Sequence, residues 1–216
     1  MHVVTHALIG WGIANLAPSL DRRARALAFW ASVIPDLDGL TILGNGLWKL
    51  HERFPGVGPL AALAGALGPD TFEVWHRILC HNVLFAAICV ALGGAFAGGL
   101  GKQRAITAGL VALNFHLHLV CDVLGSAGPD GSTWSIPYFK PFHDFRFDNP
   151  HQWALNAWPN ILTTIVMLAW AVRLALTYGR TPLEPISRAA DGALLEVLRR
   201  RFDEGNGPDG PRTNAG

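Results

Sequence analysis

Five apolar stretches of the chain alternate with shorter polar or irregular segments. They cover residues 5–20, 26–34, 74–100, 105–124 and 158–178. Because a helix that crosses a bilayer needs about 20 apolar residues, the third, fourth and fifth stretches are long enough. The first stretch is marginal and the second is short. The pattern predicts an all-α fold, a multi-pass membrane bundle of about five hydrophobic helices.

The composition agrees with a lipid environment. Half of the residues are hydrophobic and only 15% are charged, whereas soluble domains carry about 25% charged residues. The net charge of +1 argues against a nucleic-acid partner, because nucleic-acid binding needs a concentrated basic face. The expected partner is therefore the lipid bilayer. Glycines in the third stretch suit close helix packing, and whether they also support a homo-oligomer is left open.

Basic residues predict the orientation of the bundle. They lie between the first and second stretches (Arg22, Arg23, Arg25), between the third and fourth (Lys102, Arg104) and after the fifth (Arg180, Arg188, Arg199, Arg200, Arg201). Chain alternation brings all three groups to one side, which the positive-inside rule makes cytoplasmic. We therefore expect a membrane domain over residues 1–180 and an amphipathic helix over 181–203, with its helical pattern at 182–202. Residues 204–216, rich in Gly, Pro and Asn, predict a disordered tail.

The candidate metal ligands lie at the starts of the first and third predicted helices and at the ends of the second and fourth. They are His6, Asp36, Asp38, His76, His81, His118 and Asp122. If the helices alternate in direction, these side chains meet at one membrane face, opposite the basic residues and so non-cytoplasmic. Imidazole nitrogens and carboxylate oxygens are ligands for zinc, manganese and iron. The sequence predicts a divalent-metal site, with zinc favoured.

His118 and Asp122 share one helix face because they are four residues apart. His116 points roughly the opposite way, and we interpret it as a residue that packs the helix or supports a ligand without binding the metal itself. A single pair of this spacing is weak evidence by itself. Ionisable residues inside an apolar helix are costly, however, and their presence favours a functional interpretation.

Asp36 and Asp38 follow Pro35, which disfavours helical backbone at the preceding residue. On extended backbone the two carboxylates point to opposite sides. One can then bind a metal while the other orients a histidine or bridges to a second ion. An ordinary turn at the membrane surface is the alternative.

His76 and His81 are five residues apart, about 140° around a helix. They therefore cannot both bind one ion in simple geometry, so they would serve two ions, or one of them would bind substrate. Arg77 carries a fixed fork of donors suited to a phosphate or carboxylate, with snorkelling to the membrane interface as the alternative. The aromatic loop 125–157 predicts an interfacial belt.

These motifs together resemble the membrane-bound metal-dependent hydrolase family, also described as LexA-binding, inner-membrane-associated hydrolases. The resemblance covers about positions 5–140 and rests on Thr5-His6, Pro35-Asp36-Leu37-Asp38, His76-Arg77-x3-His81 and His118-x3-Asp122. It implies a bacterial inner-membrane protein with a metal-dependent hydrolase site. Three positions depart from the family pattern. The family commonly has a small residue after His-Arg, where this chain has Ile78. It has Thr before the second histidine and Ser after it, where this chain has Cys80 and Asn82.

The leading hypothesis is a hydrolase in which one or two divalent metals activate water. Its seven candidate ligands are those named above, with His76 and Asp38 also as catalytic groups and Arg77 steadying an anionic substrate. A lipid or another amphiphilic phosphoester suits a site at the membrane face. The alternatives are a metal or proton transporter and a non-enzymatic scaffold with a structural metal.

Overall fold

The computed structural model describes residues 1–17, 19–37, 53, 77–98, 101–128 and 130–203. Within these residues every regular element is a helix. The elements are α1 (Val3–Asn15), α2 (Arg22–Ala31), the short 3-10 helix η1 (Ile34–Asp36), α5 (Val83–Phe96), α6 (Lys102–Gly125), α7 (Trp158–Tyr178) and α8 (Arg188–Asp203). The predicted all-α class is confirmed for the described residues, where extended backbone pairs only at two isolated bridges of the 126–157 segment.

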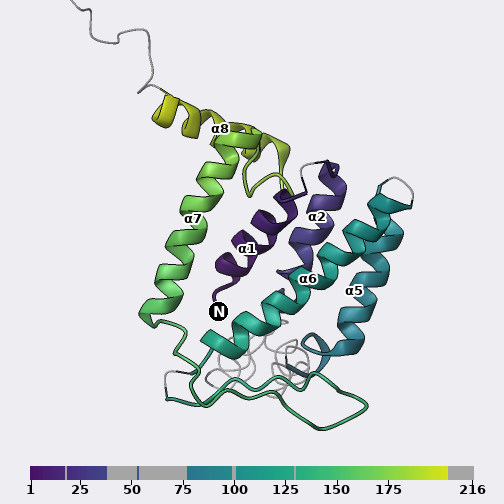
Figure 1. Ribbon diagram of the computed structural model, residues 1–216. Coiled ribbons are helices and arrows are strands. Elements are labelled where there is room, and N and C mark those ends of the chain that lie inside the picture. The colour runs from purple at the N-terminus through teal and green to yellow at the C-terminus, as the bar shows by residue number, and fades with distance from the viewer. Residues whose placement is uncertain (18, 38–52, 54–76, 99–100, 129, 204–216) are drawn as a thin grey trace, which may run out of the picture.

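Successive helices of the bundle run in opposite directions, as Figure 1 shows. The start of α1, the end of α6 and the start of α7 gather at one end, which the segment 126–157 crosses. The start of α2, the start of α6 and α8 lie at the other end. The basic groups at the starts of α2 and α6 and the candidate ligands His6, His118 and Asp122 therefore belong to opposite ends of the bundle.

The apolar stretches correspond to α1, α2, α5, α6 and α7. By length and composition, α6 and α7 could cross a membrane, whereas α1 and α5 are shorter apolar helices. The third stretch is longer than its helix, because α5 has 14 residues. The Asn82 side chain caps α5 by accepting a hydrogen bond from the Phe85 N–H, so the helix starts only at Val83.

The outer face of α7 is apolar and exposed. Five large apolar side chains on this face are each about half exposed: Ile161, Leu162, Ile165, Val166 and Leu168. Only 17% of the most apolar 18 residues of α7 are buried inside the bundle. A helix that is apolar on its outer surface suits a lipid environment rather than water.

Buried polar side chains connect the helices inside the bundle. The Asn114 side-chain amide of α6 donates to the carbonyl of Gly10 in α1 (3.0 Å) and to that of Ala28 in α2 (2.8 Å). Thr5 of α1 and Thr164 of α7 share a hydroxyl hydrogen bond of 2.6 Å. These bonds fix the helices that carry His6 and His118 relative to each other.

The C-terminal helix begins later than predicted. We expected it from residue 182, but α8 starts at Arg188. The intervening residues turn inward instead, with Thr181 and Glu184 buried and the Thr181 N–H donating to Asp191 (2.5 Å). The predicted tail, 204–216, lies outside the described residues.

Gly10→Ala is expected to lower stability, because a Cβ on Gly10 would lie 2.0 Å from Ser32 Oγ and 2.6 Å from Ser32 Cβ. Overpacking of this kind costs about 1–3 kcal/mol, more than the helix propensity that alanine adds. Gly109→Ala is the matched control, since a Cβ on Gly109 would meet nothing within 4 Å. The higher helix propensity of alanine should stabilise this variant by up to about 1 kcal/mol. Unfolding in detergent, followed by circular dichroism, measures both. Equal stability of the two variants would contradict the close approach of α1 and Ser32.

Candidate metal centre

Four side chains from three separate parts of the sequence meet where η1, the start of α5 and the end of α6 come together. They are Asp36, His81, His118 and Asp122. One ligand atom of each lies within 4.8 Å of all the others. His81, His118 and Asp122 are buried, and Asp36 is partly buried. Tertiary packing has therefore concentrated imidazoles and carboxylates in a mostly water-excluded position.

Asp122 is the centre of this cluster. Its Oδ2 lies 3.1 Å from His118 Nε2 and 3.4 Å from His81 Nε2. Its Oδ1 lies 3.1 Å from Nε2 of a further histidine, His6, and 2.5 Å from the amino nitrogen of Met1. Asp122 is therefore the carboxylate on which these groups converge, and its buried negative charge can be balanced by a protonated neighbour or by a bound cation.

Asp36 completes the group from the opposite side. Its two oxygens lie 3.6 Å from His118 Nε2 and 3.8 Å from His6 Nε2. The His6 and His118 rings approach with centroids 4.0 Å apart. Nε2 of His118 also lies 3.3 Å from Nε2 of His81. Nitrogens that face each other in this way share either a proton or a metal ion, and three imidazoles with two carboxylates form a donor set that zinc, manganese and iron accept.

A backbone carbonyl orients His118. Its Nδ1 lies 2.9 Å from the Ser32 carbonyl oxygen, so Nδ1–H donates and Nε2 presents its lone pair to the cluster. Metal-binding histidines usually have such a partner, because it fixes the tautomer and raises ligand basicity. The residues present therefore fit a divalent cation.

Sequence reasoning missed several polar neighbours of Asp122. Ser126 Oγ donates to Asp122 Oδ1 (2.9 Å), and its position four residues after Asp122, directly after the end of α6, is a signal that could have revealed it. The Gln152 side chain donates to the Asp122 carbonyl (2.6 Å) and accepts from the Trp134 N–H (2.5 Å). Nothing in the sequence pattern connects Gln152 to α6, since the contact arises from the path of the 126–157 segment.

Arg77 lies outside the four-residue cluster and contacts the same segment. Its guanidinium donates to the Ser135 carbonyl (2.9 Å) and hydroxyl (2.6 Å), and it stacks over the Trp134 ring at 4.9 Å. The Trp134 ring centroid is in turn 6.4 Å from that of His81. Arg77 therefore fastens the segment beside the cluster, and its contact with substrate stays a prediction.

The other predicted residues fall elsewhere. Asp38 and His76 lie outside the described residues. His116 faces away from the cluster, with Nδ1 2.7 Å from the Ala112 carbonyl and Nε2 2.7 Å from the Tyr138 hydroxyl. His116 therefore binds the 126–157 segment through Tyr138 and is not part of the four-residue cluster.

Comparison with known proteins connects this architecture to a family. The family model described as YdjM inner membrane protein matches residues 1–195. The chain belongs to this family. Neither the curated proteins nor the solved structures gave a match.

Membership in the YdjM family agrees with the features already described. The family is one of inner membrane proteins, and this member has two helices long and apolar enough to cross a bilayer. In this YdjM-family chain the four-residue cluster lies beside the C-terminal end of the longer of the two, α6. The cluster therefore lies at one end of a helix that is long and apolar enough to cross a membrane.

Proposed function

We propose that the protein is a metal-dependent hydrolase of the inner membrane. One observation carries this proposal: ligand atoms of Asp36, His81, His118 and Asp122 come within 4.8 Å of one another. His6 adds an imidazole to the same group. Burying so many ionisable side chains is costly without a compensating charge, and a bound cation supplies that charge.

The four residues of the cluster suit different roles in a hydrolase site. A bound divalent metal would lower the pKa of a coordinated water and polarise the scissile phosphoryl or carbonyl group. His81, His118 and Asp122 are suited to hold the ion, since they are buried and their ligand atoms face one another. Asp36 is the most exposed of the four, with 11% of its side chain accessible against 5% for Asp122. Its carboxylate is therefore the one best suited to accept a proton from the attacking water.

Asp38, His76 and Arg77 complete the proposal. Asp38 and His76 are proposed as a further ligand or acid–base group, on their sequence motifs alone. Arg77 would steady an anionic substrate at the edge of the site. Its double contact with Ser135 holds the guanidinium beside Trp134, close to His81.

A multi-pass topology with the site on the non-cytoplasmic side accounts for the charge distribution. The start of α2, the start of α6 and α8 lie at the end of the bundle away from the cluster (Figure 1). These elements carry most of the basic residues, which favour the cytoplasmic side. Fusions of a reporter enzyme at the start of α6 and within the 126–157 segment should report opposite sides of the membrane.

The test is elemental analysis of the detergent-purified protein, followed by a screen of phosphoesters and carboxylic esters. We expect about one or two divalent ions per chain and hydrolysis that chelation removes and metal addition restores. The same measurement identifies the metal, which we expect to be zinc, with manganese or iron as the alternatives.

A structural metal is the main rival, because a coordinatively closed site is typical of structural ions, and the cluster is largely buried. If chelation unfolds the protein and no ester in the panel is hydrolysed, the metal only holds the helices together. If the protein moves metal or protons across liposomes without turnover, it is a transporter. Either result would overturn the hydrolase proposal.

A further inference from the structure

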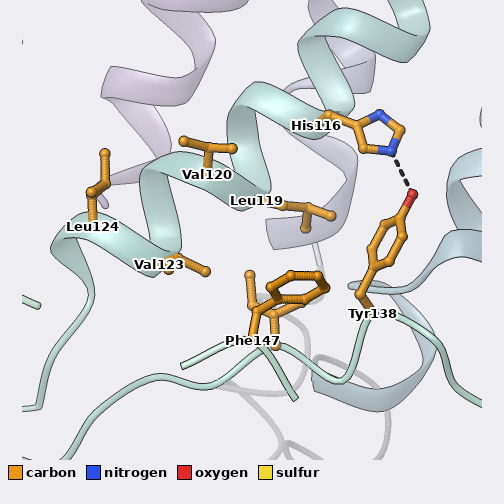
Figure 2. A pocket seen from close by; sticks show the side chains of 8 residues that line it. His116, Leu119, Val120, Val123, Leu124, Tyr138 and Phe147 are labelled. Atoms are coloured by element: carbon orange, nitrogen blue, oxygen red, sulfur yellow. Dashed lines mark hydrogen bonds between the residues drawn. The ribbon is translucent and has the colours of Figure 1, made fainter. Parts of the chain in front are cut away.

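An apolar pocket lies on another face of the helix that carries the metal centre. It has a volume of about 370 Å³, within the range of small-molecule sites. Figure 2 shows Leu119, Val120, Val123 and Leu124 of α6 along one side of it, with Tyr138 and Phe147 of the 126–157 segment opposite.

The pocket and the metal centre share one helix. Leu119 directly follows His118, and Val123 directly follows Asp122. Successive residues of an α-helix are about 100° apart, so the pocket wall adjoins the face that carries the ligands. A molecule with its apolar part in the pocket could therefore bring its polar end round α6 to the metal centre.

The lining of the pocket excludes a polar ligand. Its only polar groups are His116 and Tyr138 among the residues that line it, and these two are already hydrogen-bonded to each other at 2.7 Å (Figure 2). A polar occupant would gain at most the remaining hydrogen-bonding capacity of the Tyr138 hydroxyl and would lose its hydrogen bonds to water. The chemistry of the wall selects a hydrocarbon.

The pocket continues into the outer apolar surface of the bundle. Val120 is 53% exposed and Leu124 38% exposed, and both belong to a helix able to cross the membrane. On the facing segment, Phe142 is 75% and Phe145 50% exposed, and exposed apolar side chains of this kind suit contact with lipid. A bilayer acyl chain can therefore reach the pocket without passing through water.

We propose that this pocket binds an acyl chain of a membrane lipid and holds its head group toward the metal centre. The inference rests on the proposed hydrolase function and specifies its substrate class as a lipid ester or phosphoester. Residues of the pocket would determine the chain length that is accepted, while the cluster around Asp122 would act on the head group.

The first test maps lipid contacts on the unaltered protein. The probe is phosphatidylethanolamine with a diazirine at the end of one acyl chain, in nanodiscs of phosphatidylethanolamine and phosphatidylglycerol. After illumination, mass spectrometry should find the cross-links concentrated at residues 116–124 and 136–147. Cross-links spread evenly over α6 and α7 would overturn the proposal.

Val120→Trp fills the pocket and gives the second test. We expect it to reduce cross-linking and the preference for long-chain over short-chain esters by about tenfold or more, as a change of pocket volume does in other enzymes. Ile165→Trp is the matched control, because Ile165 is equally apolar and 57% exposed but lies on α7, away from the pocket. Equal effects of the two variants would overturn the proposal.

Metal content and hydrolysis of a short-chain, water-soluble ester separate this inference from the proposed function. If the protein binds metal and hydrolyses the soluble ester, but cross-links lie outside the pocket, only the acyl-chain site fails. If cross-links concentrate in the pocket and no ester is hydrolysed, the lipid is structural. That result would overturn both the proposed hydrolase function and the assignment of a lipid ester as its substrate.

Discussion

Asp122→Ala is expected to remove bound metal and abolish hydrolysis while the protein still inserts in the membrane. Asp122 lies within 3.4 Å of His6, His81 and His118, and it is the one carboxylate among the described residues in contact with all three. Of the described residues in this cluster, its loss leaves three buried imidazoles and one partly buried carboxylate, Asp36. Changing a group that only orients a ligand already costs about 10–100-fold in metal affinity, so we expect a loss of at least about 100-fold here. Elemental analysis and competition with a fluorescent chelator measure it.

Asp130→Ala is the matched control for this experiment. Asp130 is exposed and accepts hydrogen bonds only from Ser132 among the described residues, at 3.1 Å from the backbone and 2.6 Å from the hydroxyl. Its replacement should change neither metal content nor turnover. Undiminished metal in the Asp122 variant, or an equal loss in both variants, would contradict the assignment of the cluster as a metal site.

Glu184→Ala is expected to destabilise the protein by about 3–5 kcal/mol, the usual cost of removing one partner of a buried ion pair. Both carboxylate oxygens of Glu184 accept from the Arg25 guanidinium, with Nε 3.1 Å from Oε2. The two side chains are only 7% and 8% exposed. Without Glu184, Arg25 would remain buried beside Arg180, whose pKa is lowered by burial and by the charge of Arg25. Denaturant unfolding in detergent measures the loss.

Glu196→Ala is the control for Glu184. Glu196 also pairs with an arginine, Arg200, but the side chains are 62% and 71% exposed. An exposed pair contributes about 0–1 kcal/mol, so this variant should unfold almost as the unaltered protein does. Because Glu184 lies between α7 and α8, far along the bundle from the metal ligands, its loss should also leave metal content unchanged. Similar losses for the two variants would contradict the buried pair.

Much of the fold followed from hydrophobic patterning. The apolar stretches predicted α1, α2, α5, α6 and α7 because helix formation and membrane insertion depend on local runs of apolar residues. The ends of the elements were less predictable. Asn82 sets the start of α5 through a local partner, the Phe85 N–H, so this boundary had a signal in the sequence. The inward turn of Glu184, which delays α8, depends on Arg25, which lies 159 residues away in the sequence.

The candidate site could be predicted in its chemistry and not in its geometry. Alternation of helix direction predicted that His6, Asp36, His81 and Asp122 belong to one end of the bundle. That Asp122 lies between three imidazoles, and that the Ser32 carbonyl orients His118, required the packing of α1 and α2 on α6. The contact of Gln152 with Asp122 had no signal in the sequence at all.

The sequence by itself determined the helical class, the family, the lipid environment and the kinds of ligand available, since each depends on residue type and spacing along the chain. Only the tertiary structure decided which of those ligands share a site, how Glu184 reaches Arg25, and that an apolar pocket adjoins the cluster on α6. Those features depend on contacts between side chains that can lie more than 100 residues apart in the sequence. The distances between such side chains are set by the close packing of the helices.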